Sequence, residues 1–425
     1  MTEHFNERRR KRETSEDFEL YEAGKDYNRT IGYYENAKKN ERFYRGDQWY
    51  GVESADLPTP VFNIFKRVIN YFVSTIMSQK ISVKYSAEGL YAIGTPEEKE
   101  KADKTCKILS DYINYRFEKD KINALFTRGV FDAAITGDLF LYTYWDPSKR
   151  TCQGFSGDFV TTLYDGANVF FGDVNSNDTE EQPYILLSGR ELVTKLRREA
   201  RENGASKDVI NAITADDDNR DEAGELSSEE LKGTKCTYII KLYKKNGTVH
   251  YRKSVRAGMI CPEVDTGLTL YPVTLMNWEP VKNSYHGQAA ATGLTENQLY
   301  INKAFAMVMK HMTDVSFSKV MYNENLIDEW TNGVGEAIAV NGPPENAVLR
   351  IDPGTMQSGF LDVISMTLSV TKELMGATDA ALGNVAPENT SAIIALRQAS
   401  NIPLETQKRA LYDAAAHLVW CGLNL

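Results

Sequence analysis

Several aspartates stand at the ends of segments that read as strands, and carboxylates gathered at one sheet edge can bind metal ions. They are Asp138, Asp146, Asp158, Asp165 and Asp173. Two magnesium ions held by such a set could support phosphodiester cleavage by stabilising the attacking and leaving oxygens. Several of these aspartates occur in TGD, DG and GD sequences, which are also common in turns. A magnesium-dependent nuclease is therefore one hypothesis, and turn-forming aspartates are the other.

The histidines and cysteines do not indicate a further metal-binding or catalytic site. The histidines are His4, His250, His286, His311 and His417. They have no metal-ligand spacing among themselves or with cysteines, so we expect His286 to be a turn residue and His311 a packing residue. Walker, GxGxxG, GxSxG and HExxH motifs are absent from the sequence. We expect no self-contained active site, no cofactor and no bound metal.

The N-terminal half of the sequence reads as an arm followed by helices. Residues 1–30 are charged and poor in aliphatic side chains, which predicts an extended or partly disordered arm. Its basic run, Arg8 to Arg12, suits either a nucleic-acid contact or a solvated, charge-balanced surface. Apolar spacing predicts helices from 31 to a stop near Gly46 and over 63–79, 97–117 and 120–136.

Strands follow these helices. Alternating segments predict strands over 137–147, on both sides of Asp165-Gly166, and over 183–188, with a helix then continuing to about 203. Residues 213–230 form an acidic insert that we interpret as a solvated loop. Two alternating segments joined by Asn246-Gly247 predict a hairpin with a type I′ turn, because this pair accepts positive φ angles.

The second half contains long helices with heptad-like patterns. The first, 287–315, carries an apolar seam, and a charged stripe lies roughly opposite it; Thr295 and Gln298 have capping-box spacing within it. The seam residues are Ile301, Phe305, Val308 and Met312, and the stripe residues are Glu296, Lys303 and Lys310. A second seam helix, about 359–376, carries Leu361, Ile364 and Leu368. Strands are predicted over 336–340 and 346–351, and a third helix should be kinked in its middle at Pro403.

Composition limits the possible partners. The chain has 425 residues and a net charge of −10, enough for two or three ordinary globular domains. Affinity for DNA comes largely from lysine and arginine, so the acidic balance excludes tight wrapping of DNA but not transient contact. Apolar stretches are too short for a membrane helix, the N-terminus lacks the apolar core of a signal peptide, and scattered cysteines indicate reduced thiols.

The order of several segments is more informative than any one of them. NERFYRGDQW precedes NIFKRVINYFVSTIMSQKISV, and TGDLFLYTYWDP, ANVFFGD, YPVTLMNWEPVKNSYHG, ENQLYIN and TSAIIALRQ follow in that order. Together they resemble the portal proteins of tailed bacteriophages across most of the chain. The resemblance implies an α+β fold with a mixed α/β wing, a pair of long stem helices, a small α/β clip and a long kinked helix, assembled into a ring.

The resemblance also implies a division of the chain. Its parts would be an N-terminal arm and first wing helix (1–61), the wing (62–286), stem helix 1 (287–315), the clip (316–357), stem helix 2 (358–378), a tunnel loop (379–390) and a kinked wing helix (391–425). Many portals continue into a helical crown. Because the sequence ends in the largely apolar segment Cys421 to Leu425, we expect it to be the ordered part of a longer protein rather than to lack the crown.

On this resemblance the chain forms a ring, usually of twelve subunits, at one capsid vertex of the virion, after assembly in the host cytoplasm. Double-stranded DNA would pass through it during packaging and ejection. The other implied partners are the large terminase subunit, head-completion or adaptor proteins, and the major capsid and scaffolding proteins, with no membrane. The motor would dock on the clip, which includes Pro343, Pro344 and Arg350.

The tunnel loop would project into the bore. Its residues are Asp379, Gly383, Asn384, Val385, Ala386, Pro387, Glu388 and Asn389. A loop that touches moving DNA should bind it weakly, because each neutralised phosphate strengthens binding. The loop has no basic residue, and its glycine and asparagine permit movement. The stripe of Lys303 and Lys310 would either face the lumen or lie at a solvent-facing or intersubunit surface. The alternatives to a portal are the nuclease and another ring-forming capsid or tail connector.

Overall fold

The computed structural model describes residues 2–54, 57–87, 95–150, 154, 156–216, 235–315, 319–327, 329, 337–351, 359–374 and 402–424. The chain divides into two compact units. Unit 1 comprises Met1–Glu41, Arg67–Gly293 and Pro387–Leu425, and unit 2 comprises Arg42–Lys66 and Leu294–Ala386. The chain mixes helices with antiparallel strands, which is consistent with the α+β class expected from the sequence.

Unit 1 contains most of the regular elements. Its helices are α1 (Thr2–Thr30), α4 (Pro96–Lys119), α5 (Ile122–Thr136), α6 (Val193–Glu202), α7 (Lys207–Ala212) and α12 (Glu405–Asn424), with parts of α2 (Tyr33–Arg45) and α3 (Ile64–Ile76). Its strands are β1 (Asp138–Arg150), β2 (Ser156–Tyr164), β3 (Val169–Phe171), β4 (Ile185–Leu192), β5 (Lys235–Lys245), β6 (Thr248–Val255), β7 (Gly258–Asp265) and β8 (Val273–Asn277).

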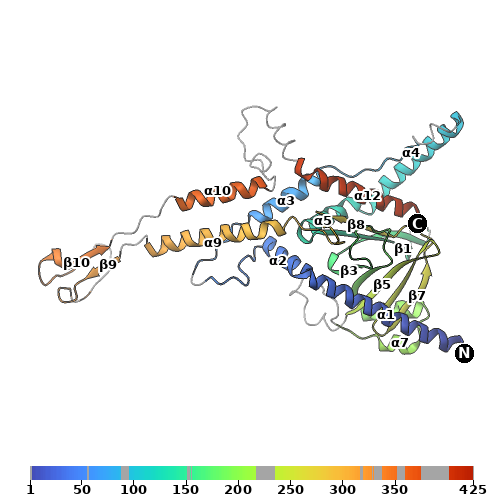
Figure 1. Cartoon of the computed structure of the whole chain (residues 1–425), viewed down its shortest axis with the longest axis horizontal. Helices are drawn as coiled ribbons and strands as arrows, with labels where there is room; N and C mark the ends of the chain where they lie inside the picture. Colours follow the sequence, from blue (N-terminus) through green and yellow to red (C-terminus); the bar gives the residue numbers. More distant parts are fainter. Residues whose placement is uncertain are drawn as a thin grey trace. The chain divides into compact units, whose positions relative to one another are not determined.

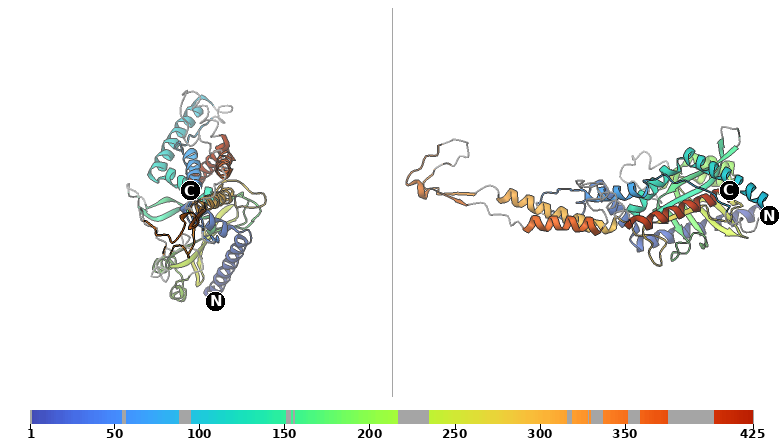
Figure 2. Two further views of the ribbon diagram at one scale, coloured as in Figure 1. Left: turned by 90° about the vertical axis from the view of Figure 1, so that its left-hand side faces the viewer. Right: turned by 90° about the horizontal axis from the view of Figure 1, so that it is seen from above.

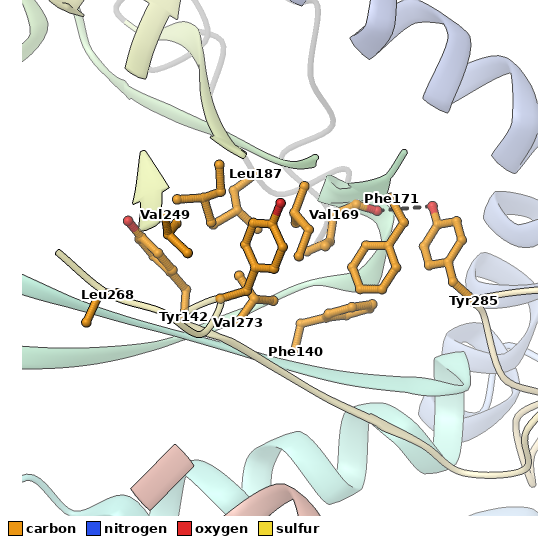
Figure 3. Close-up of a cluster of buried hydrophobic side chains, with 12 residues drawn as sticks. Phe140, Tyr142, Val169, Phe171, Leu187, Val249, Leu268, Val273 and Tyr285 are labelled. Carbon is orange, nitrogen blue, oxygen red and sulfur yellow. Dashed lines mark hydrogen bonds between the residues drawn. The ribbon is translucent and has the colours of Figure 1, made fainter. Parts of the chain in front are cut away.

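The strands of unit 1 form two antiparallel sheets that face each other. One sheet has three strands in the order β2-β1-β8, and the other has five in the order β3-β4-β5-β6-β7. Their facing side chains form one core, in which Phe140 of β1, Phe171 of β3 and Tyr285 come together (Figure 3). The Tyr285 hydroxyl donates to the Val169 carbonyl at 3.2 Å, so the polar tip of this tyrosine has a partner.

Helices cover the outer faces of both sheets. Because side chains alternate along a strand, Phe170 and Leu186 point away from the sheet-sheet core and pack on Phe18 and Tyr21 of α1. On the other side, α5 packs on β1 so closely that a Cβ on Gly129 would come within 2.5 Å of Leu139. The helix α12 lies on β8 (Figure 1). Unit 1 is therefore four layers: helix, sheet, sheet and helices.

The prediction of an extended arm over residues 1–30 is wrong, because these residues form α1. The helix is polar overall, but its buried face includes Asp17, Phe18, Tyr21 and Asn28, at helical spacing. The Asp17 carboxylate accepts hydrogen bonds from Arg252 Nε at 2.8 Å and Nη2 at 2.5 Å, and lies 3.2 Å from Lys241 Nζ. Partners far along the chain thus order a segment whose own composition predicts disorder.

The basic run near the N-terminus, for which the sequence left two interpretations, lies on a solvated face of α1. Arg9 and Arg12 pair with Glu13 and Glu16, each at 2.8 Å and four residues away on α1. These pairs are the intrahelical interactions expected for oppositely charged neighbours at this spacing. They support the charge-balanced interpretation of the run.

Several local predictions are confirmed. The helix α2 ends at Arg45, directly before Gly46 with φ +97°, and α3, α4 and α5 lie where periodicity places them. The hairpin of β5 and β6 turns at Asn246 and Gly247, with φ angles of +55° and +88°, as a type I′ turn requires. The strand β7, which adds a further strand to this hairpin, is not among the strands that the sequence predicts.

Unit 2 contains α9 (Thr292–Val315), β9 (Lys319–Tyr322), β10 (Val348–Ile351) and α10 (Gly359–Leu374). The helices α9 and α10 run side by side in opposite directions, as two views show (Figures 1 and 2). The strands β9 and β10 pair antiparallel and lie beyond the C-terminal end of α9.

Three predictions for this half of the chain need correction. The partner of β10 is β9, and residues 337–340 are not a strand; Lys319–Tyr322 has the β-branched and aromatic residues that favour pairing. The long helix begins at Thr292 rather than 287. Pro403 lies in a short 3-10 turn, Ile402–Leu404, directly before α12, so it does not kink the middle of that helix. The predicted helix before it, 391–401, lies outside the described residues.

Candidate functional site

The helix α9 has one buried face along its first half. Ile301 is buried, and the ring of Phe305 lies 4.2 Å from the ring of Phe62. Val308 is half-buried, whereas Met312 is 56% exposed, so packing along the predicted seam weakens toward the C-terminal end of the helix. The seam therefore continues as uncovered apolar surface.

The opposite face of α9 is exposed and is not purely polar. Glu296 and Lys303 are exposed and Lys310 is half-buried. Tyr300 and Met307, which are 51% and 49% exposed, lie between them with spacings of four and three residues. We call Glu296, Tyr300, Lys303, Met307 and Lys310 the outer stripe of α9. The sequence prediction identifies only its charges, although the same heptad spacing contains the tyrosine and the methionine.

Side-chain amides fix the start of α9 against the start of α3. Gln298 Oε1 accepts from the backbone N–H groups of Ile64, at 3.1 Å, and Phe65, at 3.0 Å. Its Nε2 donates to the Phe62 carbonyl at 2.8 Å and to Asn302 Oδ1 at 3.0 Å. The first N–H groups of a helix have no partner within it, so Gln298 serves α3 as a cap. The expected capping box of Thr295 and Gln298 is therefore wrong, since Gln298 caps a different helix.

The helix α10 also has two contrasting faces. Ile364 is buried and Leu368 is half-buried, whereas the side chain of Leu361 lies outside the described residues. On the opposite side, four exposed residues follow one another at spacings of four, three and four. We call Asp362, Met366, Ser369 and Glu373 the outer stripe of α10. Met366 at its centre is 69% exposed.

The strands β9 and β10 carry exposed apolar side chains. Met321 and Leu349 face each other in register, and both are exposed. Pro343 and Pro344 begin the short 3-10 turn Pro344–Asn346 that leads into β10. Arg350 lies opposite Val320 in the register, and its side chain lies outside the described residues. Among the described residues this sheet has two strands, so each has an edge with no described strand beside it, and such an edge is a natural site for pairing with another chain.

The predicted tunnel loop cannot be placed. Residues 375–401 lie outside the described part of the chain, and they include the whole segment from Asp379 to Asn389.

The aspartates that suggested a nuclease form no metal-binding cluster among the described residues. The Asp165 carboxylate accepts a hydrogen bond from the backbone N–H of Ala167 at 2.9 Å and begins a 3-10 turn. The carboxylates of Asp173 and Asp146 likewise each accept from the backbone N–H of the residue two positions later. Asp158 lies opposite Asp146 in the β1-β2 register. Within the described residues, no group of three or more histidine, cysteine or acidic side chains could hold a metal ion. Turn-forming hydrogen bonds therefore account for most of these aspartates.

Asp158 is also neutralised by its own surroundings. It pairs with Arg116 at 2.5 Å and with Lys119 at 2.8 Å. Burial raises the pKa of Asp158, but the hydrogen bonds from Lys119 and Arg116 outweigh it and hold the pKa at about 2. This carboxylate serves to join α4 to β2.

Asp138 and His286 form a buried structural pair. Asp138 Oδ2 lies 2.5 Å from His286 Nδ1, and Asp138 Oδ1 accepts from Asn277 Nδ2 and from the backbone of Gly287, both at 2.7 Å. The histidine ring stacks on Tyr33 with centroids 3.9 Å apart. His286 does follow a turn, as predicted, but its ring is buried and joins α2 to β1. Enclosure of this kind suits an anchor rather than a site that meets a substrate.

A further buried acid lies on α5. Burial raises the pKa of Asp132 to about 7, and the nearby carboxylates of Asp165 and Glu41 add to the shift, while Arg128 opposes it. No sequence pattern marks this residue, because its neighbours come from other elements.

Comparison with known proteins gives one match. Residues 21–181 match the family model of the phage P22-like portal protein. This match supports the tailed-bacteriophage portal family. No curated protein matches the chain.

The matched residues run from within α1 to beyond β3 and so lie mostly in unit 1. The helices α9 and α10 and the strands β9 and β10 lie outside the match. The family supports a phage portal function and a place in the capsid of the phage particle. Among the described residues, no helix is both long and apolar enough to cross a membrane.

Proposed function

We propose that this portal chain assembles into a closed ring at one capsid vertex and forms the channel through which double-stranded DNA is packaged and ejected. The observation that carries the proposal is the pair of antiparallel helices α9 and α10, whose outer faces leave Tyr300, Met307 and Met366 exposed. Large apolar side chains grouped on a helix face mark a surface that meets another protein. A ring of identical copies covers such faces without leaving an open end.

In this proposal, α9 and α10 are the paired stem helices, and β9 and β10 with the turn at Pro343 and Pro344 form the clip. The wing is unit 1, residues 379–390 form the tunnel loop, and the ring has twelve subunits. The clip is the docking site for the large terminase subunit and later for head-completion proteins, because its strands offer unpaired edges. The wing meets the major capsid and scaffolding proteins. The energy for packaging comes from the motor, and the portal itself carries out no catalysis.

The acidic balance of the chain agrees with this role. A channel must let a duplex slide, and strong phosphate binding would oppose movement. A ring of chains that each carry a net charge of −10 repels the DNA phosphates overall, so it does not hold the duplex tightly.

Negative-stain electron microscopy of the purified full chain tests the proposal. We expect closed rings with a central hole wide enough for a DNA duplex, with one dominant subunit number. Monomers at every concentration tested, or open helical filaments, would refute it. A parallel assay for magnesium-dependent cleavage of plasmid DNA, with Asp138→Asn as the comparison, tests the nuclease alternative. We expect no cleavage from either protein.

A further inference from the structure

A short segment of unit 1, residues 80–87 between α3 and α4, has the pattern of a strand but no strand beside it. Its odd-numbered side chains, from Ile81 to Ala87, are buried or half-buried, and its even-numbered side chains, from Lys80 to Ser86, are exposed. A period of two is that of an extended chain. None of the sheets formed by the described residues includes this segment.

Side chains of α4 and α5 bind one edge of this segment. Asn114 Oδ1 accepts from the N–H of Val83 at 3.0 Å, and Asn114 Nδ2 donates to the carbonyl of Val83 at 2.9 Å. The neighbouring odd-numbered residues also donate to helix side chains: Tyr85 N–H to Ser110 Oγ at 2.8 Å and Ile81 N–H to Asn123 Oδ1 at 2.9 Å. The asparagine and its neighbours thus take the place of an adjacent strand.

The other edge of the segment has free backbone groups. In an extended chain, the N–H and C=O groups of successive residues point to opposite edges, so those of Ser82 and Lys84 point away from the helix side chains that bind Val83. Neither residue makes a backbone hydrogen bond to any part of the chain that the structure describes. Unpaired N–H and C=O groups in a row are a template for pairing with another strand.

Charge on this edge indicates which strand would fit. Lys80 and Lys84 are exposed, lie on the same face of the segment with Ser82 between them, and form no ion pair with a described residue. If two copies of the chain paired antiparallel about Ser82, Lys80 would stand opposite Lys84, and like charges directly opposite are unfavourable. A strand with carboxylates at alternate positions would instead place an opposite charge beside each lysine.

We propose that the free edge of residues 80–86 binds an extended, acidic segment of a partner protein, which joins it as an added strand. The backbone groups of Ser82 and Lys84 supply the hydrogen bonds, and carboxylates four residues apart meet Lys80 and Lys84. A cavity of about 540 Å³ beside Ala87, lined also by Ala102 and Cys106 of α4, has room for a side chain at one end of the added strand. The edge belongs to unit 1, so this inference goes beyond the proposed ring and does not rest on it.

A synthetic peptide tests whether the edge accepts such a strand. Fluorescence anisotropy follows a labelled, acetylated peptide of sequence TEVEVET as the full chain is added. We expect saturable binding, and we expect the peptide TKVKVKT to bind roughly tenfold more weakly or worse because its lysines face lysines. Failure of TEVEVET to bind the wild type would overturn the proposal.

Methylation of the peptide backbone separates strand pairing from attraction between charges. In the antiparallel register that places glutamates beside the lysines, the glutamate N–H groups face the edge and the valine N–H groups face away. We expect N-methylation at the glutamates to abolish binding and N-methylation at the valines to leave it. If both methylated peptides bind like the unmodified one, the backbone edge is not used and the proposal is overturned.

Reversal of the edge charges tests the lysines. Lys80→Glu/Lys84→Glu should bind TEVEVET roughly tenfold more weakly and should bind TKVKVKT in its place. Lys207→Glu/Lys282→Glu is the matched control, because it changes the net charge equally at two exposed lysines elsewhere in unit 1. Equal binding of TEVEVET by these two variants would show that Lys80 and Lys84 do not select the partner.

A proline tests the backbone of the chain itself. Ser82→Pro removes one outward N–H that has no partner to lose, and its ring suits an extended backbone, so it should weaken peptide binding roughly tenfold. Ser82→Ala keeps the N–H and should bind like the wild type. Circular dichroism and urea unfolding verify that both variants fold alike. Equal peptide binding by the two would overturn the proposal.

The size of the assembly separates this inference from the proposed function. Size-exclusion chromatography with light scattering should give the same size for Ser82→Pro and the wild type without peptide. A smaller assembly in Ser82→Pro would assign the edge to contact between copies and would overturn the proposed partner. Absence of rings from the wild type, together with normal binding of TEVEVET, would refute only the proposed function.

Discussion

Removal of the Asp17 side chain provides the sharpest test of how unit 1 holds its N-terminal helix. Asp17 is fully buried and binds Arg252 through two atoms, with Lys241 Nζ 3.2 Å away. In Asp17→Ala, the buried guanidinium loses both of its hydrogen bonds to Asp17 and keeps the more distant carboxylate of Glu13, 3.7 Å from Nη1. Breaking a buried ion pair in this way costs about 3–5 kcal/mol, a large part of the roughly 5–15 kcal/mol that stabilises a typical domain.

Urea unfolding of the full chain, followed by circular dichroism, measures the loss. With an m value near 3 kcal/mol/M, a loss of about 3–5 kcal/mol lowers the midpoint by roughly 1–1.7 M. Hydrogen exchange should also show that the backbone amides of α1 lose protection before those of the sheets. Arg12→Ala is the control, because the Arg12–Glu16 pair is 82% and 45% exposed and contributes at most a few tenths of a kcal/mol.

A double replacement, Asp17→Leu/Arg252→Met, separates the ion pair from simple packing. Apolar residues of similar size leave no buried charge, so most of the lost stability should return. A loss below about 1 kcal/mol in Asp17→Ala, or no recovery in the double variant, would refute the argument that this pair anchors α1.

Two further predictions concern buried polar groups in each unit. Asp132→Asn removes a carboxyl whose pKa burial raises to about 7. A raised carboxyl pKa means that the native state binds more protons than the unfolded chain between about pH 4 and 7, so wild-type stability falls through that range by at most about 4 kcal/mol. The variant should lack this decline and be the more stable protein at pH 8 in urea unfolding; equal pH dependence in both would contradict the assignment. Gln298→Leu leaves the N–H groups of Ile64 and Phe65 without their acceptor, and we expect it to lower the free energy of unfolding by about 2–4 kcal/mol. Faster amide exchange at those two residues should accompany the loss, and unchanged exchange would show that the cap is dispensable.

The sequence predicts those elements whose signals are local. The end of α2 at Gly46 and the turn at Asn246-Gly247 each depend on a residue that tolerates positive φ, so the residue types at the turn are sufficient. The same holds for α3, whose apolar residues repeat every four positions. The order of such segments along the chain also indicates the portal family, because each segment can be identified by its own residues.

Elements that depend on distant partners are harder to predict. The helix α1 looks disordered in sequence because its stabilising partners, such as Arg252, lie more than two hundred residues away. The strand β9 is only four residues long, so it is defined by its pairing with β10 more than by its own pattern. In the candidate site, charge alone identifies the lysines of α9. The exposure of Tyr300 and Met307 beside them depends on which faces the fold leaves uncovered, and a sequence pattern does not contain that information.

The long separation between Asp17 and Arg252 has a consequence for biosynthesis. The two residues are 235 positions apart, and ribosomes add about 5–20 residues per second, so α1 waits roughly 12–47 s for its partner to be made. Asn28 and His286 are 258 positions apart and impose a similar delay. During that interval the nascent chain exposes Phe18 and Tyr21, and chaperones have time to bind them before α1 docks.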